Sequence, residues 1–550
     1  MPSLFITKRE LARAWQIIRV SGQFGLVPLL QLAGISRWFG IRRWWRRMER
    51  RFQDIPPPVR LRLALVELGT TFIKLGQVLS ARSDLLPSDY LTELARLQDE
   101  VPAIPFEEIR PVFIASFGIQ PETAFAEFNP VPFASASIGQ VYAARMRDGT
   151  EVMVKIQRPG VEAQVRTDLS LMYRVADLAN RNPYLARYDL PSMVREFANI
   201  LQDELIYTLE AHNAETLAGE MAVHPNITFP EIIWDYTSRC VLTTKRINGV
   251  KITDLTLGAL PQVDRRDISE SLANSLLEQI LLHGMFHGDP HPGNLMVTPD
   301  GTLTFLDTGM VGRLDRKTRE LLIELSISIY EEDIDSVLDT LQQLGVVMEG
   351  ADLAGLRRDL ARLITKYYFL PRKEFQLGML LQRVNHLLFE HRVRMAYEFG
   401  LMAKALFQAE GVAQALYPDF DYNRAARPVI EEVRRRYYSF HTFIEDTARE
   451  LHGMRRQIVD LPRRLSTVLS HLEHGTLRVH TQDEFLNLKH VTLHAVANRI
   501  ALTVITLVLI LAGSVLLTGH AAGWVAVLGA VMIGLGGVLL LILLAAIFRS

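Results

Sequence analysis

The sequence has few of the residues that build covalent or metal frameworks. Cys240 is the single cysteine among 550 residues, which excludes an internal disulfide and a cysteine-rich zinc site. A lone thiol of this kind is expected to fill a core position. Positive and negative charges almost cancel, with 60 Lys+Arg against 61 Asp+Glu. No global field therefore favours a nucleic-acid partner.

The N-terminus lacks the uninterrupted apolar run of a cleavable signal peptide. Lys8, Arg9 and Arg13 are followed by a mixed stretch. Residues 1–55 do hold a basic, aromatic segment in which Trp38 and Trp44 alternate with arginines. Such a helix can lie in a lipid headgroup layer, although a solvated helix that packs its tryptophans on the protein explains the pattern equally well.

Long uncharged runs are present at the other end of the chain. Residues 500–518 and 524–548 carry no charge, and each run can cross a hydrocarbon core of about 30 Å. The break between them is short, so we expect two transmembrane helices over 499–549; a buried soluble hairpin is the alternative. Arg499 and Arg549 flank the hairpin on one side. The positive-inside rule then places the large soluble part in the cytoplasm, at a bacterial inner membrane.

Between these ends the composition changes at several points. Residues 56–130 read as a helical extension that begins at a run of three prolines, 131–249 are rich in predicted strands, 250–433 are mainly helical, and 434–498 form a charged, amphipathic stalk. Strands are predicted over 140–144, 151–156 and 240–244. Asp148-Gly149 is a favourable turn between the first two strands.

The residues with the most specific chemistry lie between 287 and 309. In His287-Gly288-Asp289-Pro290-His291-Pro292-Gly293-Asn294, four residues separate the Asp from the Asn, as in a kinase catalytic loop. Asp307-Thr308-Gly309 follows at the place of the metal-binding Asp-Phe-Gly. This spacing predicts a phosphoryl-transfer site for ATP or ADP. Asp289 would face the acceptor, while Asn294 and Asp307 would hold Mg²⁺ through hard oxygen ligands.

The histidines of this region offer a metal site as an alternative. His283, His287 and His291 are spaced by four residues. Pro290 and Pro292 disfavour the helix that would align them on one face, so the magnesium and phosphate reading is preferred to zinc.

A phosphate-contacting lysine is predicted upstream. Lys155 ends a strand after the hairpin turn, as the corresponding lysine of kinases does, and Glu210 is the candidate carboxylate that positions it. Where kinases have a glycine-rich loop, this chain has small residues that leave the backbone less free. This loop, with the start of the following strand, comprises Ala134, Ser135, Ala136, Ser137, Ile138, Gly139, Gln140 and Val141.

Taken in order, these motifs resemble the UbiB family of atypical protein-kinase-like proteins. The resemblance spans about residues 61–417 and includes Lys74-Leu75-Gly76-Gln77, Ser137 to Val141, Lys155 to Gly160, and His287 to Asn294. It implies an α+β, bilobal kinase-like fold, ATP or ADP with Mg²⁺, and support of ubiquinone biosynthesis at the inner membrane. Membrane lipids or quinone precursors, quinone-biosynthesis enzymes and a second copy of the chain are the partners that it suggests.

The resemblance also assigns regulatory and nucleotide-binding residues. Lys74 and Gln77 would lie on a helix that crosses the nucleotide site and blocks protein substrates, with Glu204 as the partner of Lys74. Thr244 and Arg246 belong to the hinge over 242–249, where backbone groups hold adenine.

Three residues depart from the family pattern. Ile206 stands where an acidic residue follows Glu204, Thr308 replaces the usual Phe of the metal loop, and Lys245 stands where an acidic hinge residue is common. Because a complete set of phosphoryl-transfer residues is joined to a helix that should exclude proteins, the leading hypothesis is an ATP-dependent regulatory ATPase and not a protein kinase. A small-molecule or lipid kinase and a catalytically silent, nucleotide-sensing scaffold are the alternatives.

Overall fold

The site-bearing part of the chain is described by a computed structural model. It covers residues 7–26, 55–82, 85–97, 102–182, 185, 189–331, 333–348, 350–368 and 377–437, together with 531, 534 and 537. All but the last three belong to one unit, which ends at Ile444. The predicted hairpin over 499–549, apart from those three residues, lies outside the described residues, as do the aromatic stretch and nearly all of the stalk. No helix within the described residues has the length and apolar character to span a bilayer.

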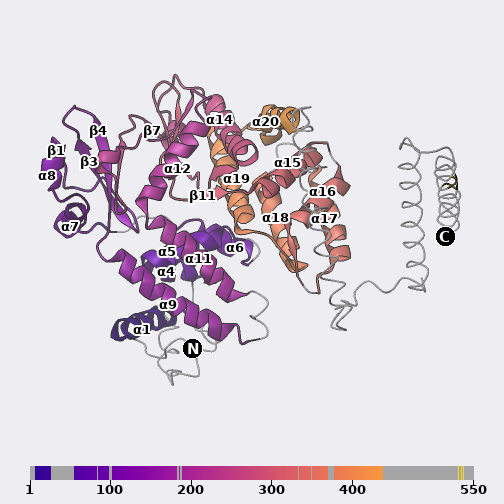
Figure 1. Ribbon diagram of the computed structural model, residues 1–550, viewed down its shortest axis with the longest axis horizontal. Helices are drawn as coiled ribbons and strands as arrows, with labels where there is room; N and C mark the ends of the chain where they lie inside the picture. Colours follow the sequence, from indigo (N-terminus) through magenta and orange to yellow (C-terminus); the bar gives the residue numbers. More distant parts are fainter. Residues whose placement is uncertain are drawn as a thin grey trace, which may run out of the picture. The chain divides into compact units, whose positions relative to one another are not determined.

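A five-stranded antiparallel sheet forms the smaller lobe (Figure 1). The strands are hydrogen-bonded in the order β1-β3-β4-β6, and β2 pairs with Gln140 and Val141 near the start of β3. The strands are β1 (Glu127–Phe128), β2 (Ala134–Ser135), β3 (Gly139–Arg145), β4 (Glu151–Gln157) and β6 (Val241–Lys245). The predicted hairpin is present as β3 and β4, and Gly149 turns the chain at φ 91°, a conformation that favours glycine.

Alternation along β4 decides where its lysine points. Val152, Val154 and Ile156 are fully buried on one face, where they pack with Phe113 of α7 (Phe106–Phe117). Because successive side chains of a strand point to opposite faces, Lys155 projects away from this apolar core. α7, α8 (Pro121–Ala124) and β1, which were predicted with the helical extension, are thus part of the sheet's own packing.

Helices cover the other side of the sheet and continue below it (Figure 1). Between β4 and β6 the chain forms the helices α9 (Val161–Ala179), α11 (Leu190–Glu204) and α12 (Tyr207–Glu220). The N-terminal helices are α1 (Lys8–Gln23), α4 (Pro57–Leu68), α5 (Thr70–Ser80) and α6 (Ser88–Leu94). Arg13 of α1 pairs with the fully buried Asp168 of α9 at 2.7 Å, which fixes α1 to this layer.

The larger lobe is mainly helical, but short strands interrupt it. They are β5 (Ile227–Thr228), β7 (Val250–Lys251), β8 (Met285–His287), β9 (Leu295–Val297), β10 (Leu303–Phe305), β11 (Val311–Arg313), β12 (Val346–Val347) and β13 (Val393–Arg394). β5-β10-β9-β7 form one sheet, and β8 pairs with β11. The expectation that residues 250–433 are mainly helical missed most of these strands, because two or three residues are too few to show alternation.

One buried helix organises the larger lobe. α19 (Tyr397–Leu416) packs against α14 (Arg265–Glu278) and α18 (Leu377–Glu390), and most of its residues are buried. The remaining elements of this lobe are α13 (Ile252–Thr256), the π-turn η4 (Gln279–His283), η5 (Pro292–Asn294), α15 (Arg316–Tyr330), α16 (Ile334–Leu344), α17 (Leu353–Tyr368) and α20 (Tyr422–Tyr437). The short helix η3 (Trp234–Tyr236) belongs to the smaller lobe, where Tyr236 packs on Phe117 and Phe125. A helix that is apolar almost all round belongs in a core, so its few polar side chains stand out.

Candidate active site

The predicted lysine and glutamate form an ion pair between the sheet and α12. Lys155 Nζ lies 2.9 Å from both carboxylate oxygens of Glu210. The lysine and glutamate side chains are 19% and 9% exposed, so solvent screens the pair only weakly. The ammonium group is also 3.5 Å from Asp307 Oδ2. One cation therefore stands between two carboxylates.

Asp307 is held in its charged form. Desolvation would raise its pKa, but Lys155, then Lys74 and the Gly309 N–H, hold the pKa of Asp307 below its usual range. The Gly309 N–H donates to Asp307 Oδ1 at 2.8 Å, which leaves Oδ2 facing Lys155. Burial lowers the pKa of Lys155, yet Asp307 and Glu210 together raise it well above its ordinary value. Both groups are thus ionised at neutral pH.

Thr308 gives the metal loop a contact that the family's Phe could not make. Its hydroxyl is buried and donates to the main-chain oxygen of Glu210 at 2.9 Å. Asn213 Nδ2 in turn donates to the Thr308 carbonyl at 3.0 Å. The loop after β10 is therefore fixed to α12 at the turn that carries Glu210.

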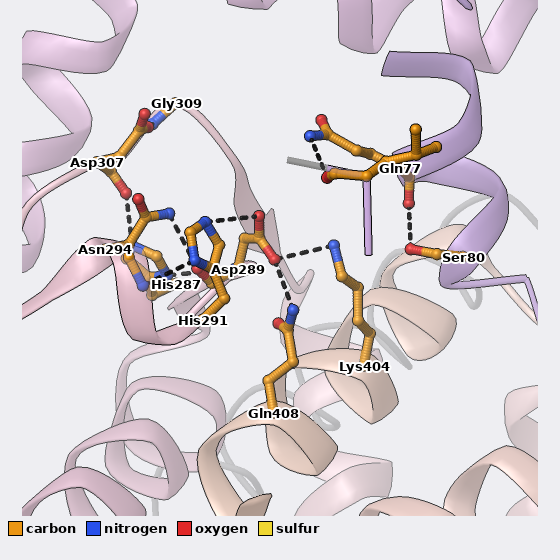
Figure 2. Close-up of polar contacts among 12 residues, drawn as sticks. Gln77, Ser80, His287, Asp289, His291, Asn294, Asp307, Gly309, Lys404 and Gln408 are labelled. Atoms are coloured by element: carbon orange, nitrogen blue, oxygen red, sulfur yellow. Dashed lines mark hydrogen bonds and ion pairs between the residues drawn. The ribbon is translucent and has the colours of Figure 1, made fainter. Parts of the chain in front are cut away.

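His287 links the two loops that carry the acidic residues (Figure 2). The ring is fully buried, and burial lowers its pKa, so it is neutral. Its Nδ1 accepts the N–H of Asp289 at 3.2 Å, and Nε2 therefore donates to the Asp307 carbonyl at 2.5 Å. The backbones of Asp289 and Asp307 are joined through one imidazole.

A hydrogen bond within the catalytic loop joins Asn294 to Asp289, whose carboxylate is held by side chains from elsewhere. Asn294 Nδ2 donates to the Asp289 carbonyl at 3.1 Å, which turns the amide oxygen away from that carbonyl. The Asp289 carboxylate is bound by Lys404 Nζ and Gln408 Nε2, each 2.9 Å from Oδ1, while His291 Nε2 lies 3.9 Å from Oδ2 (Figure 2). Burial would raise the pKa of Asp289, but Lys404 and His291 lower it to about 2.

The residues present fit a magnesium ion better than zinc. Asp307 offers an ionised carboxylate and Asn294 an amide oxygen, both of them hard ligands of the kind Mg²⁺ accepts alongside phosphate oxygens. His287 is engaged through both ring nitrogens. Among the described residues no three His, Cys, Asp or Glu side chains gather into a metal site, so the histidine alternative has no support.

The small-residue loop is held in place by a half-buried arginine. Arg158, just after β4, donates to the Ala136 carbonyl at 3.0 Å and to Ser135 Oγ at 2.7 Å. Gln140 is fully buried and accepts the Ile104 N–H at 2.7 Å. Ala134 to Val141 thus reach the edge of the site as a β2–β3 turn fixed on both sides.

Helix α5 spans both lobes beside the site. Thr70, its first residue, donates to the Ser137 carbonyl at 2.7 Å, and Lys74 pairs with Glu204 at 3.0 Å. Gln77 is buried and donates to the Leu97 carbonyl at 3.2 Å. At the other end, Ala81 lies against Gly400 of α19, where a Cβ would come 2.7 Å from the Ala81 oxygen. Lys74 and Glu204 are therefore brought together, and Lys74 is close enough to affect Asp307, whereas Gln77 binds the Leu97 carbonyl.

The hinge residues lie further from the ionic cluster. Thr244 pairs with Met153 in the β4–β6 ladder. The Arg246 N–H and guanidinium are both bound to Glu151, at the far end of β4 from Lys155. Four residues of strand span about 13 Å, so Arg246 is not among the groups gathered around Asp307.

Sequence reasoning missed the two side chains that hold Asp289. Lys404 and Gln408 lie in an otherwise apolar helix far along the chain, Gln408 being 119 residues from Asp289. The available signal was the charge itself, because lysine is almost never fully buried unless it is paired. The sequence around Lys404 gives no indication that Asp289 is its partner.

Comparisons with known proteins agree with this architecture. A family model for the ABC1 atypical kinase-like domain matches residues 96–341, and one for the UbiB helical domain matches 360–421. A Xylella fastidiosa protein named probable protein kinase UbiB is 31% identical over 469 residues, 84% of this chain and 85% of that protein. Its Azotobacter vinelandii namesake is 32% identical over 430 residues, 77% and 79% of the two chains.

A solved structure is also similar. The Mycobacterium tuberculosis protein Rv3197, in complex with erythromycin, is 27% identical, with a TM-score of 0.43 over 65% of this chain and 94% of that one. The family assignment does not depend on it, since both domain models and the two curated relatives agree. The chain belongs to the UbiB family of ABC1 atypical kinase-like proteins.

Proposed function

We propose that this family member is a membrane-anchored, Mg-ATP-dependent ATPase that supports isoprenoid-quinone biosynthesis, ubiquinone being the quinone implied by the family. The observation that carries the proposal is the Lys155 ammonium between Glu210 and Asp307, at 2.9 and 3.5 Å. Phosphoryl transfer depends mainly on positioning and charge neutralisation, and this cluster supplies both.

Each group has a role in that chemistry. Lys155 would contact the phosphates, and backbone groups of the 242–249 hinge would hold adenine. Asn294 and Asp307 would hold Mg²⁺, which when bound neutralises phosphate charge. Asp289, fixed by Lys404 and Gln408, would orient the attacking water or acceptor.

The position of α5 supports a small acceptor. The helix contacts the small-residue loop through Thr70 and the larger lobe through Ala81, and its Lys74 lies close enough to affect Asp307. A protein substrate would have to displace this helix and its Lys74–Glu204 ion pair. The uncharged runs over 500–518 and 524–548 would hold the site beside a membrane, where quinone precursors dissolve.

Asp307→Asn tests the proposal. The variant should lose Mg-ATP binding, and in a deletion strain it should fail to restore the quinone content that the wild type restores. Asp300→Asn, in the exposed turn between β9 and β10, is the matched control. Wild-type values in both measurements for Asp307→Asn would contradict the proposal.

A lipid or small-molecule kinase is the second candidate. The oriented Asp289 carboxylate favours it, because such a group suits an alcohol acceptor as well as water. Transfer of labelled γ-phosphate to a membrane lipid extract would support this reading. Release of inorganic phosphate alone would support the ATPase.

A further inference from the structure

One face of α19 contacts two separate parts of the site, the end of α5 and the catalytic loop. Gly400 lies against Ala81 after α5, and Leu401 packs on Gly288 of the catalytic loop, where a Cβ would come 3.0 Å from its methyl groups. Lys404 and Gln408 follow one and two turns later, so they share that face. Figure 2 shows both side chains rising from α19 to Asp289.

Lys404 is unusual in being a buried charge. Its side chain is 7% exposed, and it lies among apolar residues of the larger lobe. Burying an ammonium group is costly unless an opposite charge and hydrogen bonds compensate for lost water. Asp289, itself 16% exposed, supplies that compensation at 2.9 Å. The pair is therefore a specific feature and not a screened surface contact.

The geometry separates the two oxygens of Asp289. Lys404 and Gln408 both bind Oδ1, while the partner of Oδ2 among the described residues is the more distant His291 ring, at 3.9 Å. An oxygen bound by two donors from one helix cannot rotate without breaking both contacts. Oδ2 is consequently fixed as the oxygen that can meet an incoming hydroxyl group.

We propose that Lys404 is a positioning residue, a cation delivered from the helical domain that fixes the Asp289 carboxylate so that Oδ2 faces the water or acceptor. The proposal deepens the function given above and rests on it. Lys404 does not bind the nucleotide, which is the task of Lys155. Its loss should therefore reduce kcat without reducing the affinity for Mg-ATP.

The test compares Lys404→Met with Lys404→Arg and with Met402→Leu, a buried control on the same helix. Lys404→Met should reduce kcat on the order of a hundredfold, as expected for a misplaced reacting group, with Mg-ATP affinity unchanged. Lys404→Arg keeps the charge and should recover part of kcat, and Met402→Leu should match the wild type. In the Asp289→Asn background, Lys404→Met should cause no further loss.

Thermal unfolding of the same variants keeps the test decisive if Lys404→Met folds poorly. That variant leaves the Asp289 charge buried without its cation, so the Asp289→Asn/Lys404→Met double variant should be more stable. Wild-type kcat in Lys404→Met, additive losses in the double variant, or no recovery of stability would overturn the proposal. A wild-type protein that turns over no ATP would instead refute the proposed function, and the stability comparison would still test the pair.

Discussion

The hydroxyl of Thr308 donates to the main-chain oxygen of Glu210 at 2.9 Å, and thus joins the metal loop to the helix whose carboxylate holds Lys155. In the family pattern this position is usually Phe. At this position a side-chain hydrogen bond therefore takes the place of the packing of an aromatic ring. The hydrogen bond connects the loop that carries Asp307 to the helix that carries Glu210.

Thr308→Val should destabilise the protein by about 1 kcal/mol, because it removes a buried hydrogen bond while preserving shape. Thr308→Phe should cost about 1–3 kcal/mol, since the site is fully packed around a small residue. Chemical denaturation measures both. Thr216→Val, which removes an exposed hydroxyl that bonds a carbonyl within α12, should change stability far less. A stabilised Thr308→Phe variant would show that the loop can accept the family's usual residue.

Gly400→Ala tests the contact between α19 and the end of α5. The added Cβ would lie 2.7 Å from the Ala81 carbonyl oxygen, so backbone must move, at a cost of about 1–3 kcal/mol. Gly411 lies on the same helix with nothing within 4 Å of its Cβ position. Gly411→Ala should therefore stabilise the helix by about 0.4–1 kcal/mol. Equal shifts in melting temperature for both variants would argue against a tight α5–α19 contact.

Glu210→Gln should weaken the binding of Mg²⁺ at the nucleotide site. Without the Glu210 charge, Lys155 has Asp307 as its nearest carboxylate, at 3.5 Å, and competes with Mg²⁺ for it. The Mg²⁺ concentration needed for half-maximal ATP binding should rise roughly tenfold to a hundredfold, as for other outer-shell partners. Glu215→Gln, one turn further along α12 and exposed, is the control. An unchanged Mg²⁺ requirement would show that Lys155 does not compete with Mg²⁺ for Asp307.

The buried Glu410 predicts a pH-dependent stability. Burial raises its pKa to about 7, against the effect of the Gly378 and Leu377 N–H groups, from 4.5 in the unfolded chain. A pKa raised by folding means that the stability from the protonated group is complete below pH 4.5 and is lost as the pH rises through 7. Glu410→Gln should gain on the wild type by up to about 3 kcal/mol between pH 5 and 8. A difference between the two proteins that stays constant with pH would contradict this.

The local parts of the site could be predicted from the sequence. The β3–β4 hairpin follows from alternation around Asp148-Gly149, and it carries Lys155 to the correct face. The spacing from Asp289 to Asn294 is short, so a single loop brings the two together. The choice of Glu210 over other acidic residues of the same run matches the ion pair that the structure contains.

Contacts between distant segments could not be predicted in this way. Gln408 is 119 residues from Asp289, and only the packing of α19 under the catalytic loop makes them neighbours. From the sequence, Thr308 is only a departure from the usual Phe. Its contribution is a hydrogen bond to the backbone of α12, which the sequence does not reveal. The short strands β8 and β11, which hold His287 in place, are too brief for any periodicity to reveal them.

The lone cysteine of the chain is a built-in reporter of sheet opening. Cys240 immediately precedes β6, and its carbonyl accepts the N–H of Gln157 at the end of β4. Cys240 is half-buried and burial raises the pKa of its thiol, so alkylation should be slower than for a free thiol and should become faster when this edge of the sheet opens. Because the chain has no second cysteine, the alkylation rate of the unmodified protein would report how often β6 separates from β4, the strand that carries Lys155. A rate that slows when Mg-ATP is added would register nucleotide arrival without any dye or substitution.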